Sequence, residues 1–80
     1  MVDADTIIRE ALKRRLGEKN LQIIVVGAEI SVKPFRDIDP ADLRHRAKEH
    51  GLHLQHGDGY VAVSQWNILT DETTYYVVRE

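Results

Sequence analysis

The segment 21–33, LQIIVVGAEISVK, constrains the fold of this chain more than any other part of the sequence. It is rich in β-branched residues, and Gly27-Ala28 places glycine at the first central position of a type II′ hairpin turn. A two-residue loop there would pair Val26 with Glu29 and the preceding residues in step. Directly opposed residues share a face of a hairpin. One face would then be entirely apolar and would need a covering layer; its members are Leu21, Ile23, Val25, Ile30 and Val32.

Two segments predict the helices that could form this layer. In residues 3–17, apolar side chains recur at helical spacing up to Leu16, an aspartate can cap the start, and Gly17 can end the helix. In residues 36–52, Asp39 is placed as an N-cap and Pro40 as the first helical residue. A helix is therefore expected on each side of the first hairpin.

The stretch GLHLQHGDGYVAVSQW, residues 51–66, predicts a second hairpin around the glycines of HGDG. Each possible turn puts the same four apolar residues on one face, namely Leu52, Leu54, Val61 and Val63. Residues 73–80, TTYYVVRE, read as a final strand that folds back on the one before it. The apolar positions change from odd to even between Val63 and Trp66, which predicts a bulge near Ser64-Gln65.

These elements give the order α-β-β-α-β-β-β and an α+β fold. We expect one compact domain over residues 1–80, with an antiparallel or mixed sheet of about five strands and two helices packed on one face.

Composition excludes several classes of function. The 80 residues contain no cysteine, which rules out disulfides, thiolate zinc sites and cysteine nucleophiles. The net charge of −2 gives no overall attraction to nucleic acid or to an anionic membrane. Since no apolar run has the length of a signal peptide or a membrane span, a cytoplasmic setting, prokaryotic or phage, is expected, without membrane contact.

Two helices cannot cover both faces of a five-stranded sheet, so some apolar side chains should stay exposed. Exposed apolar patches often mark interfaces. The leading interpretation is therefore a small non-enzymatic protein–protein interaction module: a regulator, an adaptor or a phage-type inhibitor. Its partner would be another protein or a second copy in a homodimer. The residues expected at this surface are Ile24, Val26, Trp66, Tyr75 and Tyr76.

An alternative is a nucleic-acid-binding regulator that uses a basic helical face. If both helices lie on one side, their outer surfaces would form a mildly positive patch for phosphates or an acidic partner. The residues in question are Arg9, Lys13, Arg14, Arg44, His45 and Lys48. The simpler interpretation of these residues is a solvated surface with helical ion pairs.

The four histidines, at positions 45, 50, 53 and 56, raise the question of a metal site or a nuclease. Their expected directions diverge, so no metal site, cofactor, small-molecule ligand or catalytic residue is predicted. A small ribonuclease-type toxin stays open as a further alternative, with His53, Arg44 and Tyr60 as acid, base and phosphate-binding groups.

Overall fold

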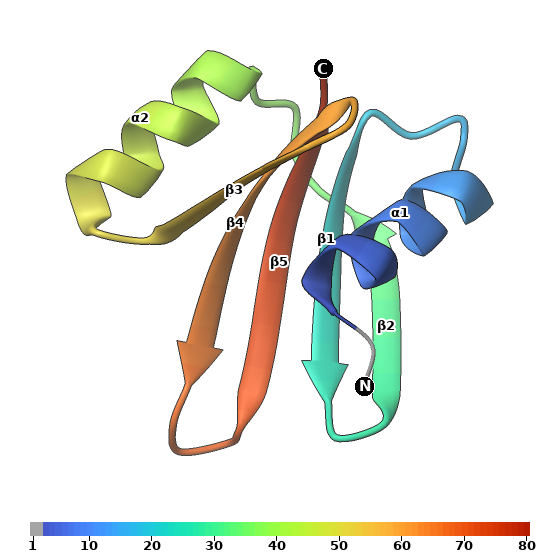
Figure 1. The fold of residues 1–80 in the computed structure, drawn as a ribbon, viewed down its shortest axis with the longest axis vertical. Helices are drawn as coiled ribbons and strands as arrows, with labels where there is room; N and C mark the ends of the chain where they lie inside the picture. Colours follow the sequence, from blue (N-terminus) through green and yellow to red (C-terminus); the bar gives the residue numbers. More distant parts are fainter. Residues whose placement is uncertain (1–2) are drawn as a thin grey trace.

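In the computed structural model, which describes residues 3–80, two helices and five strands follow one another in the expected order. They are α1 (Ala4–Arg14), β1 (Asn20–Val26), β2 (Glu29–Pro34), α2 (Pro40–His50), β3 (His53–Gly57), β4 (Tyr60–Asn67) and β5 (Glu72–Arg79). The strands form one sheet in the order β2-β1-β5-β4-β3, and every neighbouring pair is antiparallel. The α+β class and the five-stranded antiparallel sheet are confirmed (Figure 1).

Both predicted hairpins form with the expected faces. In the first, Val26 pairs with Glu29. Gly27 has a φ of 58°, and a positive φ at this position is what a type II′ turn requires. In the second, β3 and β4 are joined by Asp58-Gly59, and its apolar face packs into one core cluster. Hydrophobic alternation therefore predicted the register of the first hairpin and the apolar face of the second, whose exact turn it left open.

The first helix begins as predicted but ends earlier. Asp3 is the N-cap, and its carboxylate accepts a hydrogen bond from the backbone N–H of Thr6 at 2.8 Å. This bond satisfies a free donor at the helix start and lowers the pKa of Asp3. Because α1 stops at Arg14, Leu16 leaves the expected apolar stripe and is 77% exposed.

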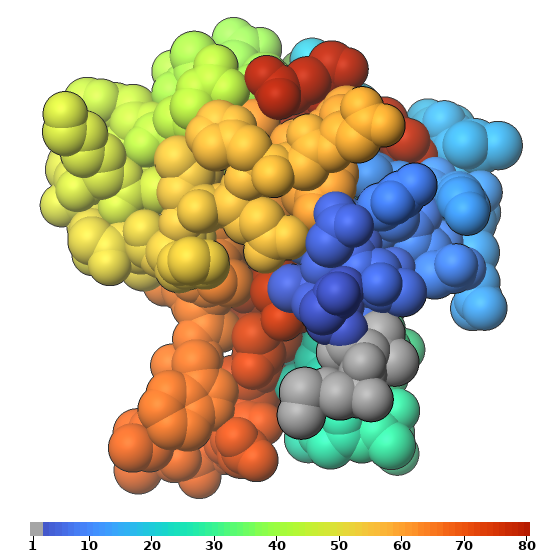
Figure 2. Space-filling view, in the orientation of Figure 1, coloured from blue at the N-terminus to red at the C-terminus, as the bar shows by residue number. Residues whose placement is uncertain are grey.

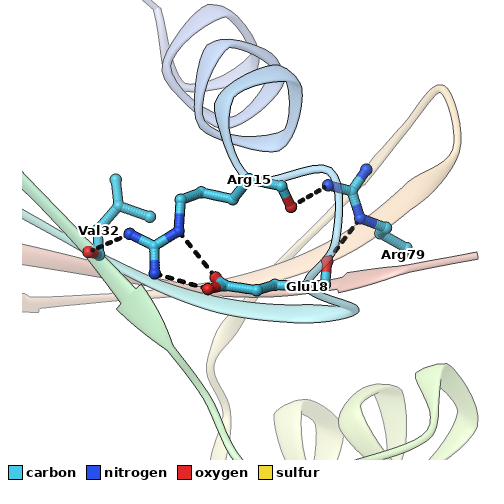
Figure 3. Close-up of polar contacts among 4 residues, drawn as sticks. All are labelled: Arg15, Glu18, Val32 and Arg79. Atoms are coloured by element: carbon cyan, nitrogen blue, oxygen red, sulfur yellow. Dashed lines mark hydrogen bonds and ion pairs between the residues drawn. The ribbon is translucent and has the colours of Figure 1, made fainter.

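An arginine from the last strand fixes the end of α1 to the sheet (Figure 3). The guanidinium of Arg79 donates three hydrogen bonds of 2.7–2.9 Å to backbone carbonyls in the last turn of α1 and in the connection that follows it, and the last carbonyls of a helix have no partner within the helix. The three acceptors are Leu12, Arg15 and Glu18. The side chain of Arg15 in turn pairs with the Glu18 carboxylate and donates to the Val32 carbonyl at 3.1 Å. Where the sequence predicted a last helical turn ending in apolar Leu16, the chain instead forms a connection held by polar contacts.

The second helix has the expected boundaries. Pro40 is its first residue, and Gly51 follows its last residue with a φ of 66°. This left-handed conformation is a common way to end a helix. The backbone N–H of Leu52 then donates to the Ala47 carbonyl at 2.8 Å. Only Leu43 and Ala47 of this helix are buried, so α2 presents a narrow apolar stripe to the sheet.

The two helices lie on opposite faces of the sheet, which corrects the expectation that both pack on one face. Ile8, Ala11 and Leu12 of α1 form a core cluster with Val77, whereas Leu43 of α2 belongs to a second cluster with Val78. Consecutive strand residues point to opposite faces. The physical reason is that β4 and β5 are apolar at consecutive positions, as in strands that are buried on both faces.

The expected bulge near Ser64-Gln65 is absent. The pairing of β4 with β5 continues in step from Tyr60 to Asn67. The change in apolar parity that predicted it has another cause, because Trp66 is 61% exposed and does not belong to the core.

Candidate functional site

Exposed apolar side chains gather at one end of the sheet. Six large apolar side chains are exposed among residues 3–80, and five of them lie where the β1–β2 and β4–β5 turns are found. We refer to these five as the open end: Val26, Ile30, Trp66, Ile68 and Leu69. Figure 1 shows β1, β2, β4 and β5 extending below both helices at this end. The open end is therefore a part of the sheet that neither helix covers.

On the α1 side, strand register places an apolar row across the open end. Trp66 pairs with Thr73, Thr73 with Val25, and Val25 with Ile30. Adjacent strands lie about 4.8 Å apart, so this row spans about 14 Å. Ile30 was expected in the covered face of the first hairpin but is 51% exposed.

On the α2 side, the corresponding row is more acidic. Val26 lies between Glu29 of β2 and Glu72 of β5, and Asn67 continues the row on β4. Segments 24–32 and 64–74 together contain three acidic residues and no lysine, arginine or histidine. Arg14 of α1 lines one surface hollow together with Ile30. The open end thus combines apolar side chains with net negative charge.

Side-chain hydrogen bonds shape the β4–β5 turn. The indole N–H of Trp66 donates to the Asp71 carboxylate at 3.0 Å, and the backbone N–H of Leu69 donates to the Asn67 side chain at 3.0 Å. Asp71 has a φ of 54°, a conformation that aspartate tolerates better than most residues. Ile68 and Leu69, which are 73% and 91% exposed, are thereby held at the tip of the projecting hairpin (Figure 2).

The residues predicted to contact a partner are divided between the two faces. Ile24, Val26 and Tyr76 share the α2 face, while Trp66 and Tyr75 lie on the α1 face. Val26 and Trp66 are exposed, Ile24 is partly buried, and each tyrosine packs partly against the core cluster on its own side. Only Val26 and Trp66 therefore belong to the open end.

The six basic and histidine residues predicted for phosphates do not form one patch. Arg9, Lys13 and Arg14 are on α1 and the other three are on α2, on the opposite side of the sheet. Arg9 pairs with Asp5 at 3.7 Å, and Arg44 pairs with Glu80 at 3.3 Å.

The remaining two residues of this set, His45 and Lys48, are exposed on α2. His45 lies 3.3 Å from Glu49, the partner one turn later in the helix. These contacts are those of a solvated helix surface.

The side chains considered for a nuclease are also far from a common site. His53 is exposed on the α1 face, whereas Arg44 lies on α2 on the other side. Tyr60 is fully buried beneath α1. Across residues 3–80, no group of three or more His, Cys, Asp or Glu side chains is arranged to hold a metal ion.

Tyr60 is the most perturbed titratable group. Its hydroxyl donates to the Asp5 carboxylate at 2.5 Å and accepts a hydrogen bond from Gln55 at 2.9 Å. Burial, followed by the bond to Asp5, raises the pKa of Tyr60 to about 12, since both disfavour the ionised phenol. The phenol stays protonated at neutral pH, and its bond to Asp5 joins α1 to the sheet.

Sequence reasoning missed Ile68 and Leu69, the most exposed apolar residues of the open end. A signal was present, since WNILTDET has two aliphatic residues inside an otherwise polar turn segment.

Neither α1 nor α2, the helices within residues 3–80, has the length and apolar content needed to cross a bilayer. Comparison with protein-family models, curated proteins and solved structures found no match to this chain.

Proposed function

We propose that this protein is a non-enzymatic protein–protein interaction module that binds its partner through the open end of the sheet. One observation carries the proposal: five of the six exposed large apolar side chains within residues 3–80 gather where neither helix covers the sheet. Exposing them to water is unfavourable, and burying them against a partner would recover about 25 cal/mol per Å² of apolar surface. Exposed apolar side chains that are grouped on one part of a small protein often mark an interface.

The charge of the open end favours a partner with a basic rim. Glu29 and Glu72 flank Val26, and Asp71 lies at the tip of the neighbouring hairpin. Lysine or arginine around an apolar centre on the partner would complement these carboxylates and increase the association rate. Two copies of this chain joined through the same end would instead bring both sets of carboxylates together. We therefore favour a different protein over a homodimer, and we propose the cytoplasm as its compartment.

Affinity capture from the native host lysate tests the proposal, with and without nuclease treatment. Leu69→Asp removes apolar surface from the open end, and Leu16→Asp is a matched control because Leu16 is also highly exposed but lies after α1. Both variants should fold, since exposed substitutions usually change stability by less than about 0.5 kcal/mol. The wild type and Leu16→Asp should capture the same protein, nuclease-resistant and released by salt, while Leu69→Asp should not.

Two results would contradict this proposal. Capture of the same partner by Leu69→Asp would place the contact elsewhere on the molecule. Release of the captured material by nuclease would instead favour nucleic-acid binding. Sedimentation of the purified protein at several concentrations gives an independent measurement, and a dimer that Leu69→Asp dissociates would replace the foreign partner with a second copy.

A further inference from the structure

A second apolar hollow lies at a different place, between α2 and the sheet. Its volume is about 260 Å³, and its apolar walls come from α2, from strands β4 and β5, and from the segments beside the helix. The apolar side chains that form the walls are Phe35, Ile38, Leu43, Leu52, Val63 and Tyr76. Cavities of about 150 Å³ already hold a benzene ring, so this one accommodates a single ring or a short branched chain.

The hollow exists because α2 fills little of the space above the sheet. Only Leu43 and the small Ala47 point inward from the helix. On the sheet side, Phe35 and Tyr76 form an aromatic pair with centroids 4.8 Å apart and planes tilted by 46°. Rigid rings on one side and a sparse helix on the other leave an open apolar volume.

Besides the Tyr76 phenol, the polar side chains that line the hollow are two guanidinium groups and one imidazole. Arg36, Arg46 and His50 border the hollow, and no acidic residue does so. Within residues 3–80, neither arginine forms an ion pair with a carboxylate, although Asp42 is one helical turn before Arg46. Two arginines beside an apolar hollow are therefore free to bind an added anion.

The wall that carries Arg36 is held in place by a buried side chain. Asn20, which is 4% exposed, donates from its amide to the Arg36 carbonyl at 2.8 Å and to the Ile38 carbonyl at 3.3 Å. The guanidinium of Arg36 lies over the Phe35 ring, 5.7 Å from its centroid, within the range of a cation–π contact. The connection between β2 and α2 thus supplies a fixed backbone and a cation at the edge of the hollow.

We propose that this hollow binds a small amphipathic carboxylate, an aryl or branched aliphatic acid. The apolar body enters among the side chains of α2 and the sheet, and the carboxylate accepts hydrogen bonds from Arg36 and Arg46. Guanidinium groups bind carboxylates through paired N–H donors. The hollow thus offers, at one place, apolar walls for the body of the ligand and arginines for its carboxylate. The residues that form it are distant from one another in the sequence.

Titration of the labelled protein with 3-phenylpropionate, followed by amide NMR shifts, tests this proposal. Shifts should concentrate around residues 35–38, 43–52, 63 and 76, with a Kd of about one millimolar or tighter. 3-Phenylpropionamide has the same ring without the charge and should bind about tenfold more weakly. Propionate has the charge without the ring and should bind more weakly than either.

Protein variants assign the charge contact. Arg36→Gln with Arg46→Gln should weaken 3-phenylpropionate binding about tenfold or more and leave the amide unaffected. Both arginines are exposed, so the variant keeps its core. Lys48→Gln is the control, since Lys48 is on α2 but does not border the hollow, and it should bind like the wild type.

Several outcomes overturn the proposal. Equal affinity for the acid and the amide would remove the role of the arginines, and shifts outside the hollow would remove the site. If propionate bound as tightly as 3-phenylpropionate, the apolar hollow would contribute nothing and the site would only be an anion contact. A peptide ending in phenylalanine that binds more than about tenfold tighter than 3-phenylpropionate would reassign the hollow to a peptide terminus.

Discussion

Substitution of Gly57 by alanine tests the packing on which the fold depends. Gly57 pairs with Tyr60 across the second hairpin, and the Tyr60 ring lies over the glycine backbone. A Cβ at position 57 would overlap ring carbons Cε2 and Cζ. The ring cannot move freely, because it is fully buried and its hydroxyl is hydrogen-bonded to Asp5 and Gln55.

The magnitude follows from these contacts. Forcing additional atoms into a packed core costs about 1–3 kcal/mol. A shift of the ring also weakens its hydroxyl hydrogen bonds, at about 1–2 kcal/mol more. We expect Gly57→Ala to lower the free energy of unfolding by about 3 kcal/mol, which corresponds to a decrease in Tm of about 12–24 °C for a domain of this size.

Thermal unfolding followed by circular dichroism gives the measurement, with Gly17→Ala as the control. No atom lies within 4 Å of a Cβ at position 17. This variant should therefore be neutral or more stable by about 0.5 kcal/mol. In a Tyr60→Leu background, the cost of Gly57→Ala should fall below about 1 kcal/mol because the overlapping ring is gone. Equal Tm values for Gly57→Ala and Gly17→Ala would refute the reasoning.

Three further predictions concern titration, helix anchoring and a helix end. The unfolded phenol ionises near pH 10, whereas the pKa of folded Tyr60 is about 12. The stabilisation that comes from this difference is therefore complete below pH 10, and about 2–3 kcal/mol of it is lost as the pH rises through 12. Denaturant titrations of Tyr60→Phe should lack this part of the alkaline loss of stability. Arg79→Gln leaves helix-end carbonyls unpaired and should cost about 2–3 kcal/mol with faster amide exchange in α1, whereas Arg14→Gln should change little; equal stability of the two variants would contradict this. Position 51 has a φ of 66°. Gly51→Ala should therefore destabilise by about 1 kcal/mol, and Gly51→Asn by less; a more stable alanine variant in urea unfolding would be inconsistent with that conformation.

Local patterns in the sequence predicted most of the fold. Alternating apolar residues set the register around Gly27, and Pro40 and Gly51 marked the ends of α2, because turns and helix ends depend on neighbouring residues. Asp39 occupies the predicted N-cap position, but its side chain makes no capping hydrogen bond. The placement of the two helices on opposite faces depends on the order of the strands in the sheet, which local patterns do not reveal. β5 lies between β1 and β4, which buries both faces of its C-terminal half under different helices.

The candidate site was predictable only in part. Trp66 and Val26 were identified from the sequence, but the partner surface was assigned to one sheet face rather than to one end. The sequence did not predict this location, because how far the strands extend beyond the helices decides which side chains stay exposed. That extent depends on tertiary packing. The hollow beside α2 was not predicted, since its walls come from segments as far apart as Phe35 and Tyr76.

Photo-crosslinking in the native host tests the central claim, that the open end is the partner-binding surface, most directly. A benzoylphenylalanine placed at position 69 samples the tip of the β4–β5 hairpin, and the same group at position 16 samples a site that is also highly exposed but lies outside the open end. We expect one discrete protein adduct at position 69, absent at position 16 and reduced by Trp66→Asp. An adduct that forms equally at both positions, or only at position 16, would contradict it.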